Sequence, residues 1–256
     1  MFSSSGSRSS GSKASKRGAA DEGKLAAIQS LFQKYADPGD EYLYSSTVVV
    51  LFIIYFVFLD EVDCISVEEA GGQLFEDLGI DGGSDAKAIV LLWRLGAKRK
   101  NADKPMTITA EVFAQRMLQL NATSLPSLKA ILPSFDPGFL ENDEYVDFLS
   151  FAFDLNRDVP RKTLMRDTVL DLLPIVLTKE RAPHLDLFMQ FLRENEAVKD
   201  ITLDQWKTFM RFNQQVPLDC KGYNADDGAW PLLFDDYVDW RANSSSCSNS
   251  HHAKKK

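Results

Sequence analysis

Apolar residues recur along most of this chain at three- and four-residue spacing, the period of an amphipathic α-helix. The pattern is present around residues 74–78 and 113–120, and it is clearest near the start of the chain, at Leu25, Ile28, Leu31, Phe32 and Tyr35. Clusters of Pro, Gly and Asp separate further helices, which we expect at 84–97, 138–155, 161–177, 184–195, 202–213 and 230–241. The pattern therefore predicts an all-α fold.

Two local signals refine these helices. Residues 202–205 read Thr-Leu-Asp-Gln, a capping box that starts a helix at Leu203 and places Asp204 in its first turn, pointing outward. Pro174 lies inside the helix expected at 161–177, where it should kink or break the helix because proline lacks a backbone N–H.

One segment departs from the helical pattern. Residues 42–59 carry no charge, and 48–59 are continuously apolar and rich in β-branched and aromatic side chains. A membrane span requires about 20 apolar residues, and a buried strand would need a partner in a helical chain. Asp-Glu pairs at 40–41 and 60–61 bracket the segment, which favours an insertion into a loop. The other two interpretations, an anchor and a buried strand, stay open.

The charge of the chain is unevenly distributed. Residues 1–20 and 244–256 are rich in Ser, Gly, Asn and Lys, carry no acid, and are expected to be disordered basic tails. The formal net charge is −8, so removing the +4 and +3 of these tails leaves −15 for the predicted domain, residues 21–243. Such an acidic body repels nucleic acid and attracts basic protein surfaces.

Composition points to an intracellular protein without catalytic signatures. The three cysteines are widely spaced, so neither a disulfide framework nor a zinc site is indicated, and the N-terminal stretch lacks the apolar region of a secretory signal. Glycine-rich phosphate loops and nucleophile motifs are absent. The one histidine of the expected body, His184, follows Pro183 at a helix start and is interpreted as structural.

The acidic loop near residues 60–71 invites comparison with a calcium-binding loop. Starting at Asp60, position six is Ile65 instead of glycine, and position twelve is Gly71 instead of glutamate. The sequence therefore predicts no bound calcium and no other metal or cofactor. An EF-hand-like shape without calcium remains compatible with the helix, loop, helix pattern.

The segment 224–241 combines aromatic and acidic residues. The pattern predicts a helix from Trp230 to Arg241, with Trp230, Leu233, Phe234, Tyr237 and Val238 on the core face. Three acids, Asp235, Asp236 and Asp239, lie on its other faces, and the small residues Gly228 and Ala229 precede the helix. An acidic rim around a small apolar spot suits docking of a basic partner. A solvated acidic face would give the same pattern.

At these residues the chain resembles the defective-in-cullin-neddylation family. The similarity is carried by GAWPLLFDD at 228–236 and continues through DQWKTF at 204–209, YVDFLSFAF at 145–153, LFEDLGID at 74–81 and LFQKYADP at 31–38. The resemblance implies an all-helical domain in which an EF-hand-like N-terminal lobe packs on a helical C-terminal lobe. It also implies a scaffold-type ligase component, and not an enzyme.

The resemblance implies two binding sites. The first binds the C-terminal winged-helix region of a cullin, and carried over by motif it comprises Asp204, Ala229 and Asp235. The second is an apolar pocket for the acetylated N-terminus of the neddylation conjugating enzyme, with matching residues Phe75, Leu91, Ile108 and Leu155, and with Leu74 and Phe113 behind them. Gly71 replaces a bulkier residue of the family pattern, and core packing accounts for the same apolar residues.

The expected function is therefore promotion of cullin neddylation within a cullin-RING ligase complex, in the cytoplasm and nucleus. The protein would hold the cullin and the charged conjugating enzyme together, acting by proximity and orientation. The alternative is a helical adaptor that residues 42–59 anchor to a membrane.

Overall fold

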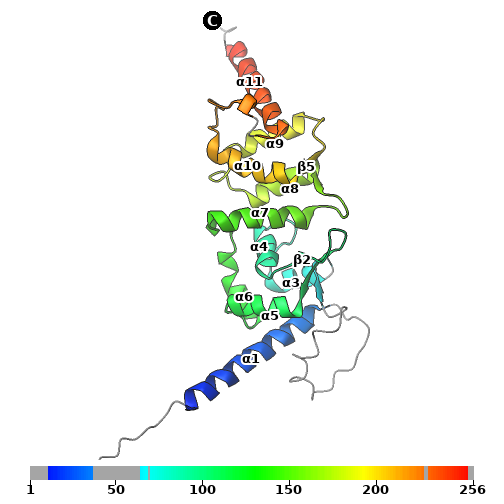
Figure 1. Cartoon of the computed structure of the whole chain (residues 1–256), viewed down its shortest axis with the longest axis vertical. Helices are drawn as coiled ribbons and strands as arrows, with labels where there is room; N and C mark the ends of the chain where they lie inside the picture. The colour runs from blue at the N-terminus through cyan, green and yellow to red at the C-terminus, as the bar shows by residue number, and fades with distance from the viewer. Residues whose placement is uncertain (1–10, 37–63, 69, 228–229, 253–256) are drawn as a thin grey trace, which may run out of the picture. The chain divides into compact units, whose positions relative to one another are not determined.

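The computed structural model describes residues 11–36, 64–68, 70–227 and 230–252 (Figure 1). The apolar segment 42–59 and the pair Gly228–Ala229 lie outside the described residues, so the interpretations of that segment are not tested. In chain order the elements are α1 (Gly11–Tyr35), β1 (Cys64–Ser66), α3 (Ala70–Leu78), α4 (Ala86–Arg94), β2 (Lys98–Arg99), β3 (Met106–Thr109), α5 (Ala110–Gln119), α6 (Leu125–Ile131), α7 (Asn142–Asn156), β4 (Thr163–Met165), α8 (Arg166–Val176), α9 (Leu185–Glu194), β5 (Asp200–Thr202), α10 (Leu203–Gln215) and α11 (Leu232–His252), with short 3₁₀ turns at Leu132–Ser134, Pro137–Phe139 and Ala225–Asp227.

The predicted helical fold is confirmed, because the structure is mostly helical and its strands are short. The chain divides into two compact units, each described by itself below. Unit 1 comprises Met1–Gly82, Leu91–Lys100 and Pro105–Ser134, and unit 2 comprises Gly83–Val90, Asn101–Lys104 and Phe135–Lys256.

Unit 1 contains a strand pair formed by two segments that are far apart in the sequence. Strand β1 follows α1 and β3 precedes α5, and the two strands run antiparallel with Ile65 opposite Ile108. Both isoleucines are buried, while their strand neighbours are partly or fully exposed. Cross-strand pairing of two buried aliphatic residues fixes the register, because a slip by one residue would turn both toward solvent. Strand β2 adds to β3 as a hairpin.

Two helices, α3 and α4, are followed by glycines with left-handed backbone conformations. Gly96 has φ +79° after α4, and Gly79 has φ +74° after α3. The N–H of Ala97 donates to the carbonyl of Leu92 at 3.0 Å, which satisfies an end carbonyl of α4. A Cβ on Gly96 would lie 2.5 Å from Cγ1 of Val112, so the chain also approaches α5 too closely there for any other residue.

Unit 2 repeats the same arrangement with different residues. Strand β4 lies between α7 and α8, β5 lies between α9 and α10, and the two strands are antiparallel with Leu164 opposite Ile201. Both residues are buried. The helix expected from residue 161 therefore starts only at Arg166, because the extended backbone of 163–165 is used for this pairing. That boundary prediction was wrong, since local periodicity carries no information about a strand partner far along the chain.

Other boundaries also differ from the sequence pattern. Helix α8 does not break at Pro174 and ends at Val176, so the proline occupies the last turn. Helix α11 starts at Leu232 and continues past Arg241 to His252, into the predicted tail, where the sequence contains neither glycine nor proline to end it. At the other end α1 already begins at Gly11, within the stretch predicted as a tail.

Within the described ranges, no helix combines the length and the apolar character needed to cross a bilayer.

Candidate functional site

The start of α10 has the predicted local structure. Thr202 Oγ1 accepts a hydrogen bond from the N–H of Gln205 at 3.2 Å, and Gln205 Oε1 accepts from the N–H of Thr202 at 2.9 Å. The capping box is thus confirmed. Asp204 lies in the first turn and is exposed, where a carboxylate interacts favourably with the positive end of the helix dipole.

Tertiary contacts fix this helix start in unit 2. Ile201 is buried in β5 just before the cap. Trp206 is 4% exposed, its Nε1–H donates to the carbonyl of Leu149 in α7 at 2.9 Å, and its ring lies 6.1 Å from that of Phe153. The side chain of Asp204 therefore stands on a backbone that is anchored on both sides.

The start of α11 presents acids above an aromatic core. Leu233, Phe234 and Tyr237 are buried, as predicted, and Asp236 and Asp239 are exposed. Asp235 is half-buried in the first turn and accepts a hydrogen bond from the hydroxyl of Tyr223 at 2.5 Å.

An exposed apolar residue accompanies these acids. Leu232, the first residue of α11, is 72% exposed, although its neighbour Leu233 is buried. The apolar spot that the sequence assigns to Gly228 and Ala229 lies outside the described residues. An exposed apolar side chain, Leu232, is nevertheless present at the helix start itself.

Aromatic stacking joins α10 and α11. The ring of Phe212 stacks on Phe234 with centroids 5.0 Å apart and meets Trp230 edge-on at 5.4 Å. The guanidinium of Arg211 lies 4.8 Å from the centroid of the Trp230 ring. Since Asp204 precedes Phe212 by about two helical turns, it lies roughly 12 Å along α10 from this contact. Asp204 and Asp235 thus belong to two helices that pack on each other within unit 2.

His184 packs edge-on against Phe212 and Tyr237 of the aromatic cluster and is fully buried. Its Nε2 lies 3.0 Å from the carbonyl oxygen of Val216, which can only accept, so Nε2 carries the proton. Nδ1 then accepts from the hydroxyl of Tyr237 at 2.9 Å. Burial holds the pKa of His184 below its ordinary value. These bonds fit the interpretation of His184 as structural, because its ring joins Tyr237 of α11 to the backbone at the end of α10.

The predicted conjugating-enzyme pocket residues occupy different surroundings. In unit 1, Leu91 and Ile108 have no exposed surface, whereas Phe75 on α3 is half-buried. Leu155 is half-buried on α7 and belongs to unit 2. The two residues placed behind the pocket, Leu74 and Phe113, are fully buried.

Two glycines define the space around Phe75. A Cβ on Gly82 would lie 2.6 Å from Cδ2 of Phe75, so the ring rests directly on that backbone. A Cβ on Gly71, where the family pattern has a bulkier residue, would be 3.8 Å from Cε2 of Phe75, an ordinary contact distance. The glycine at 71 therefore leaves room beside the ring for at least a methyl group.

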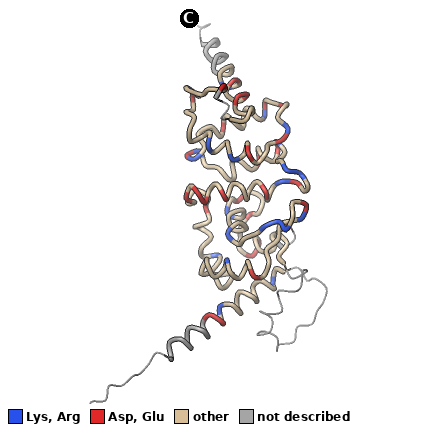
Figure 2. The backbone as a smooth tube through the Cα atoms, in the orientation of Figure 1, with Lys and Arg blue, Asp and Glu red and all other residues tan. Residues whose placement is uncertain are grey.

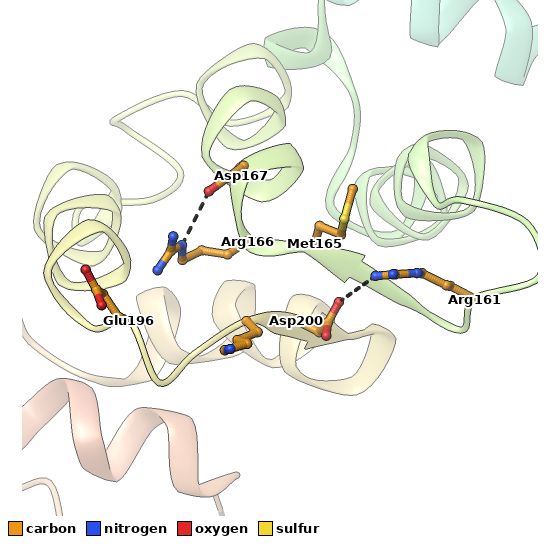
Figure 3. A pocket seen from close by; sticks show the side chains of 7 residues that line it. Arg161, Met165, Arg166, Asp167, Glu196 and Asp200 are labelled. Carbon is orange, nitrogen blue, oxygen red and sulfur yellow. Dashed lines mark hydrogen bonds and ion pairs between the residues drawn. The ribbon is translucent and has the colours of Figure 1, made fainter.

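Charge within the units is mixed along the backbone (Figure 2). Basic residues are consecutive at Lys98–Lys100, in and just after strand β2, and at Arg161–Lys162, just before β4. A surface pocket of about 540 Å³ adjoins the β4–β5 pair, as Figure 3 shows. It is lined by Arg161, Met165, Arg166, Asp167, Glu196, Lys199 and Asp200. Ion pairs within this lining, such as Arg161 to Asp200 at 3.6 Å, neutralise part of its charge. The pocket contains none of the predicted site residues.

In the part of the chain that the structure describes, no group of three His, Cys, Asp or Glu side chains could hold a metal ion.

The sequence pattern missed Tyr223, whose hydroxyl contacts Asp235 directly. A signal was present, since Tyr223 is an aromatic residue within a polar stretch, between Gly222 and Asn224.

The amino-acid sequence is similar to one protein family and to several known proteins. Residues 127–240 match the family described as "Cullin binding". The chain is 26% identical to human DCN1-like protein 3 over 224 residues, which cover 86% of this chain and 64% of that protein. It is 28% identical to DCN1-like protein 3 of Xenopus laevis over 71% of this chain and 58% of the relative. With human DCN1-like protein 4 it shares 28% identity over 64% of this chain and 53% of the relative.

These matches confirm the resemblance to the defective-in-cullin-neddylation family. The chain spans somewhat less than two thirds of the length of the DCN1-like relatives that it matches. The family match includes the predicted docking residues Asp204, Ala229 and Asp235, and it ends at Trp240.

Proposed function

We propose that this chain, whose residues 127–240 match the family described as "Cullin binding", promotes cullin neddylation as a non-catalytic scaffold. The observation that carries the proposal is the presence of Asp204 and Asp235 in the first turns of two packed helices inside the matched region. The protein would bind a cullin and the neddylation conjugating enzyme at the same time.

The proposed cullin site consists of Asp204, Ala229 and Asp235, and its partner is the basic C-terminal winged-helix region. Both carboxylates lie at helix starts held by buried neighbours, so they need little reorganisation on binding. Opposite charges steer the encounter, and the exposed Leu232 supplies apolar area to bury beside them.

The proposed conjugating-enzyme site involves Phe75, Leu91 and Ile108 of unit 1, and it would receive the acetylated N-terminus of that enzyme. The fourth residue that the resemblance implies, Leu155, belongs to unit 2 and stays a prediction from the sequence. Support comes from Phe75, which has partly exposed apolar surface and lies beside the buried Gly71, where a Cβ would make only ordinary contacts. Leu91 and Ile108 are fully buried, so an entering methionine would reach them only after the side chains that cover them move.

The proposed scaffold in unit 1 is EF-hand-like without calcium. The β1–β3 pair, with α3 after β1 and α5 directly after β3, supports this assignment. The sequence near residue 60 lacks the glycine and glutamate that calcium requires. The scaffold would accelerate transfer by raising the effective concentration of the acceptor lysine near the conjugating enzyme's thioester. We expect this to take place in the cytoplasm and nucleus, within cullin-RING ligase complexes.

Charge reversal tests the cullin site. We expect Asp235→Lys to weaken binding of the cullin C-terminal region by at least about a hundredfold, because it replaces an attraction with a repulsion in a partly desolvated site. The neighbouring variant Asp236→Lys makes the same change on an exposed face and should weaken binding by less than about fivefold. Equal effects of the two variants, measured by fluorescence anisotropy, would remove Asp235 from the site.

A reconstituted cullin modification assay tests the function itself. Wild-type protein should accelerate transfer of the modifier to the cullin, and Asp235→Lys should return the rate to that without the protein. Running the assay with chains that carry and lack residues 42–59 separates the scaffold from the membrane-anchored alternative. An unaccelerated reaction with a folded chain of either type would overturn the proposal.

A further inference from the structure

Tyr223 occupies the loop between α10 and α11 and is held there by aromatic contacts. Its side chain is half-buried, with ring centroids 5.8 Å from Phe212 and 6.2 Å from Trp230. The preceding backbone turns sharply, because Cys220 and Gly222 have φ of 56° and 81°. The aromatic ring is thus fixed against α10 independently of what its hydroxyl group does.

The hydroxyl of Tyr223 reaches the proposed docking surface. It donates to Oδ1 of Asp235 at 2.5 Å, a charge-assisted hydrogen bond across the start of α11. Burial, and then the hydrogen bond to Asp235, raise the pKa of Tyr223. The phenol therefore stays protonated at neutral pH and remains a donor.

This hydrogen bond restricts a side chain that would otherwise rotate. An aspartate in the first turn of a helix samples several rotamers, and binding a partner in one of them costs conformational entropy. With Oδ1 held by Tyr223, the carboxylate keeps one orientation and presents Oδ2 to a basic side chain.

We propose that Tyr223 is a positioning residue that pre-orients Asp235 for a lysine or arginine of the cullin. The inference rests on the proposed function, because it gives Tyr223 a role at that same site. Tyr223 would act on the partner only through Asp235. It belongs neither to the two helix starts nor to the apolar spot.

Tyr223→Phe isolates the hydroxyl, since phenylalanine keeps the ring contacts with Phe212 and Trp230. We expect this variant to bind the cullin C-terminal region about three- to tenfold more weakly than the wild type, through loss of pre-organisation. Asp235→Ala removes the acceptor, and water can reach the half-buried hydroxyl that is left. In the Asp235→Ala background, adding Tyr223→Phe should change the dissociation constant by less than about 1.5-fold.

The four proteins of this cycle are compared as full chains by isothermal titration calorimetry, with urea unfolding measured on each. Tyr237→Phe is the matched control, because it also removes one tyrosine hydroxyl from unit 2, the one bound to His184, and should leave cullin affinity within about twofold.

The outcomes separate the two proposals. Equal weakening by Tyr223→Phe in both backgrounds, or none in the wild-type background, overturns the positioning role. If Asp235→Ala itself leaves affinity unchanged, the proposed docking site fails as well. If Asp235→Ala weakens binding and Tyr223→Phe does not, the docking site stands and the positioning role is lost.

Discussion

The two units use the same device to place a helix start, and they differ in what surrounds it. Each has a short antiparallel strand pair with two buried aliphatic residues opposite each other, Ile65 with Ile108 in unit 1 and Leu164 with Ile201 in unit 2. In both, the strand ends in a threonine that caps the next helix, Thr109 before α5 and Thr202 before α10.

Each of the two capping threonines is followed by an acid at the same position. Glu111 and Asp204 each stand two residues after the capping threonine, and both are exposed. The helix that follows α5 is α6, whose first turn contains no acid, whereas the first turn of α11 after α10 contains Asp235. A capped acidic helix start is therefore common to both units. A second acid in the first turn of the next α-helix distinguishes α10 and α11 of unit 2 from α5 and α6 of unit 1.

Their cores differ as well. The core of unit 1 relies mainly on aliphatic residues, with Phe32 and Phe113 in contact at 5.6 Å. In unit 2 aromatic rings connect α9, α10 and α11, as in the stack of Phe188 on Phe209 with centroids 4.3 Å apart. These ring contacts hold α9, α10 and α11 together, which would support the proposed docking surface.

The largest effects are expected from truncating the strand pairs. Ile108→Ala and Ile201→Ala each open a cavity at the centre of a ladder and should lower the free energy of unfolding by about 2–5 kcal/mol in urea titrations. Asp200→Ala, on the exposed position beside Ile201, should change it by less than about 0.5 kcal/mol. Among folded molecules, Ile201→Ala should weaken cullin binding and Ile108→Ala should not. Equal losses of binding would contradict the assignment of the docking site to unit 2.

Reversing the equivalent acids tests the difference between the helix starts. Asp204→Lys should weaken cullin binding by more than about tenfold, or roughly 1.4 kcal/mol. Glu111→Lys imposes the same charge change at the same position after a cap, so its effect on the helix dipole is matched. We expect its affinity for the cullin to stay within about twofold of the wild type. An effect of Glu111→Lys as large as that of Asp204→Lys would mean that the affinity follows net charge alone.

The aromatic core of unit 2 contains a titratable group, and this predicts a pH dependence. Burial lowers the pKa of His184, so below about pH 6.5 the unfolded chain binds more protons than the folded one. The stability that the neutral imidazole contributes is complete above that pH and is lost as the pH falls, by up to about 1.4 kcal/mol per pH unit.

The control for this dependence is His184→Gln, which has no group that titrates in the range. Its free energy of unfolding, measured in urea between pH 7.5 and 5.5, should fall less steeply than that of the wild type. The charge of Arg241 also disfavours the protonated imidazole, and both proteins retain it. Parallel curves would show that His184 is not held neutral by the fold.

The smallest effect is expected from the caps themselves. Thr202→Ala should lower the free energy of unfolding by about 1 kcal/mol, because it leaves an N–H of α10 without its acceptor. Thr109→Ala should have a smaller effect, since the bond from the N–H of Val112 to Thr109 Oγ1 is longer, at 3.4 Å, than the 3.2 Å bond in α10. A larger loss for Thr109→Ala, in parallel urea titrations, would contradict the correspondence between bond length and cap strength.

Local features of this protein were determined by its sequence. The helical period, the capping box at Thr202 and the outward position of Asp204 follow from contacts between residues three or four apart, so a short window of sequence contains both partners. The motif GAWPLLFDD and its companions likewise indicated the family that the comparisons support.

Only the tertiary structure decided which distant residues meet. Strand β4 was predicted as helix because its partner, β5, lies far along the chain. The bond between His184 and Tyr237 spans 53 residues, and the one between Tyr223 and Asp235 crosses a loop whose course local propensity does not specify. Such contacts form when apolar surfaces of separate helices are buried together. Their geometry is a property of the whole packed core and of no single stretch of sequence.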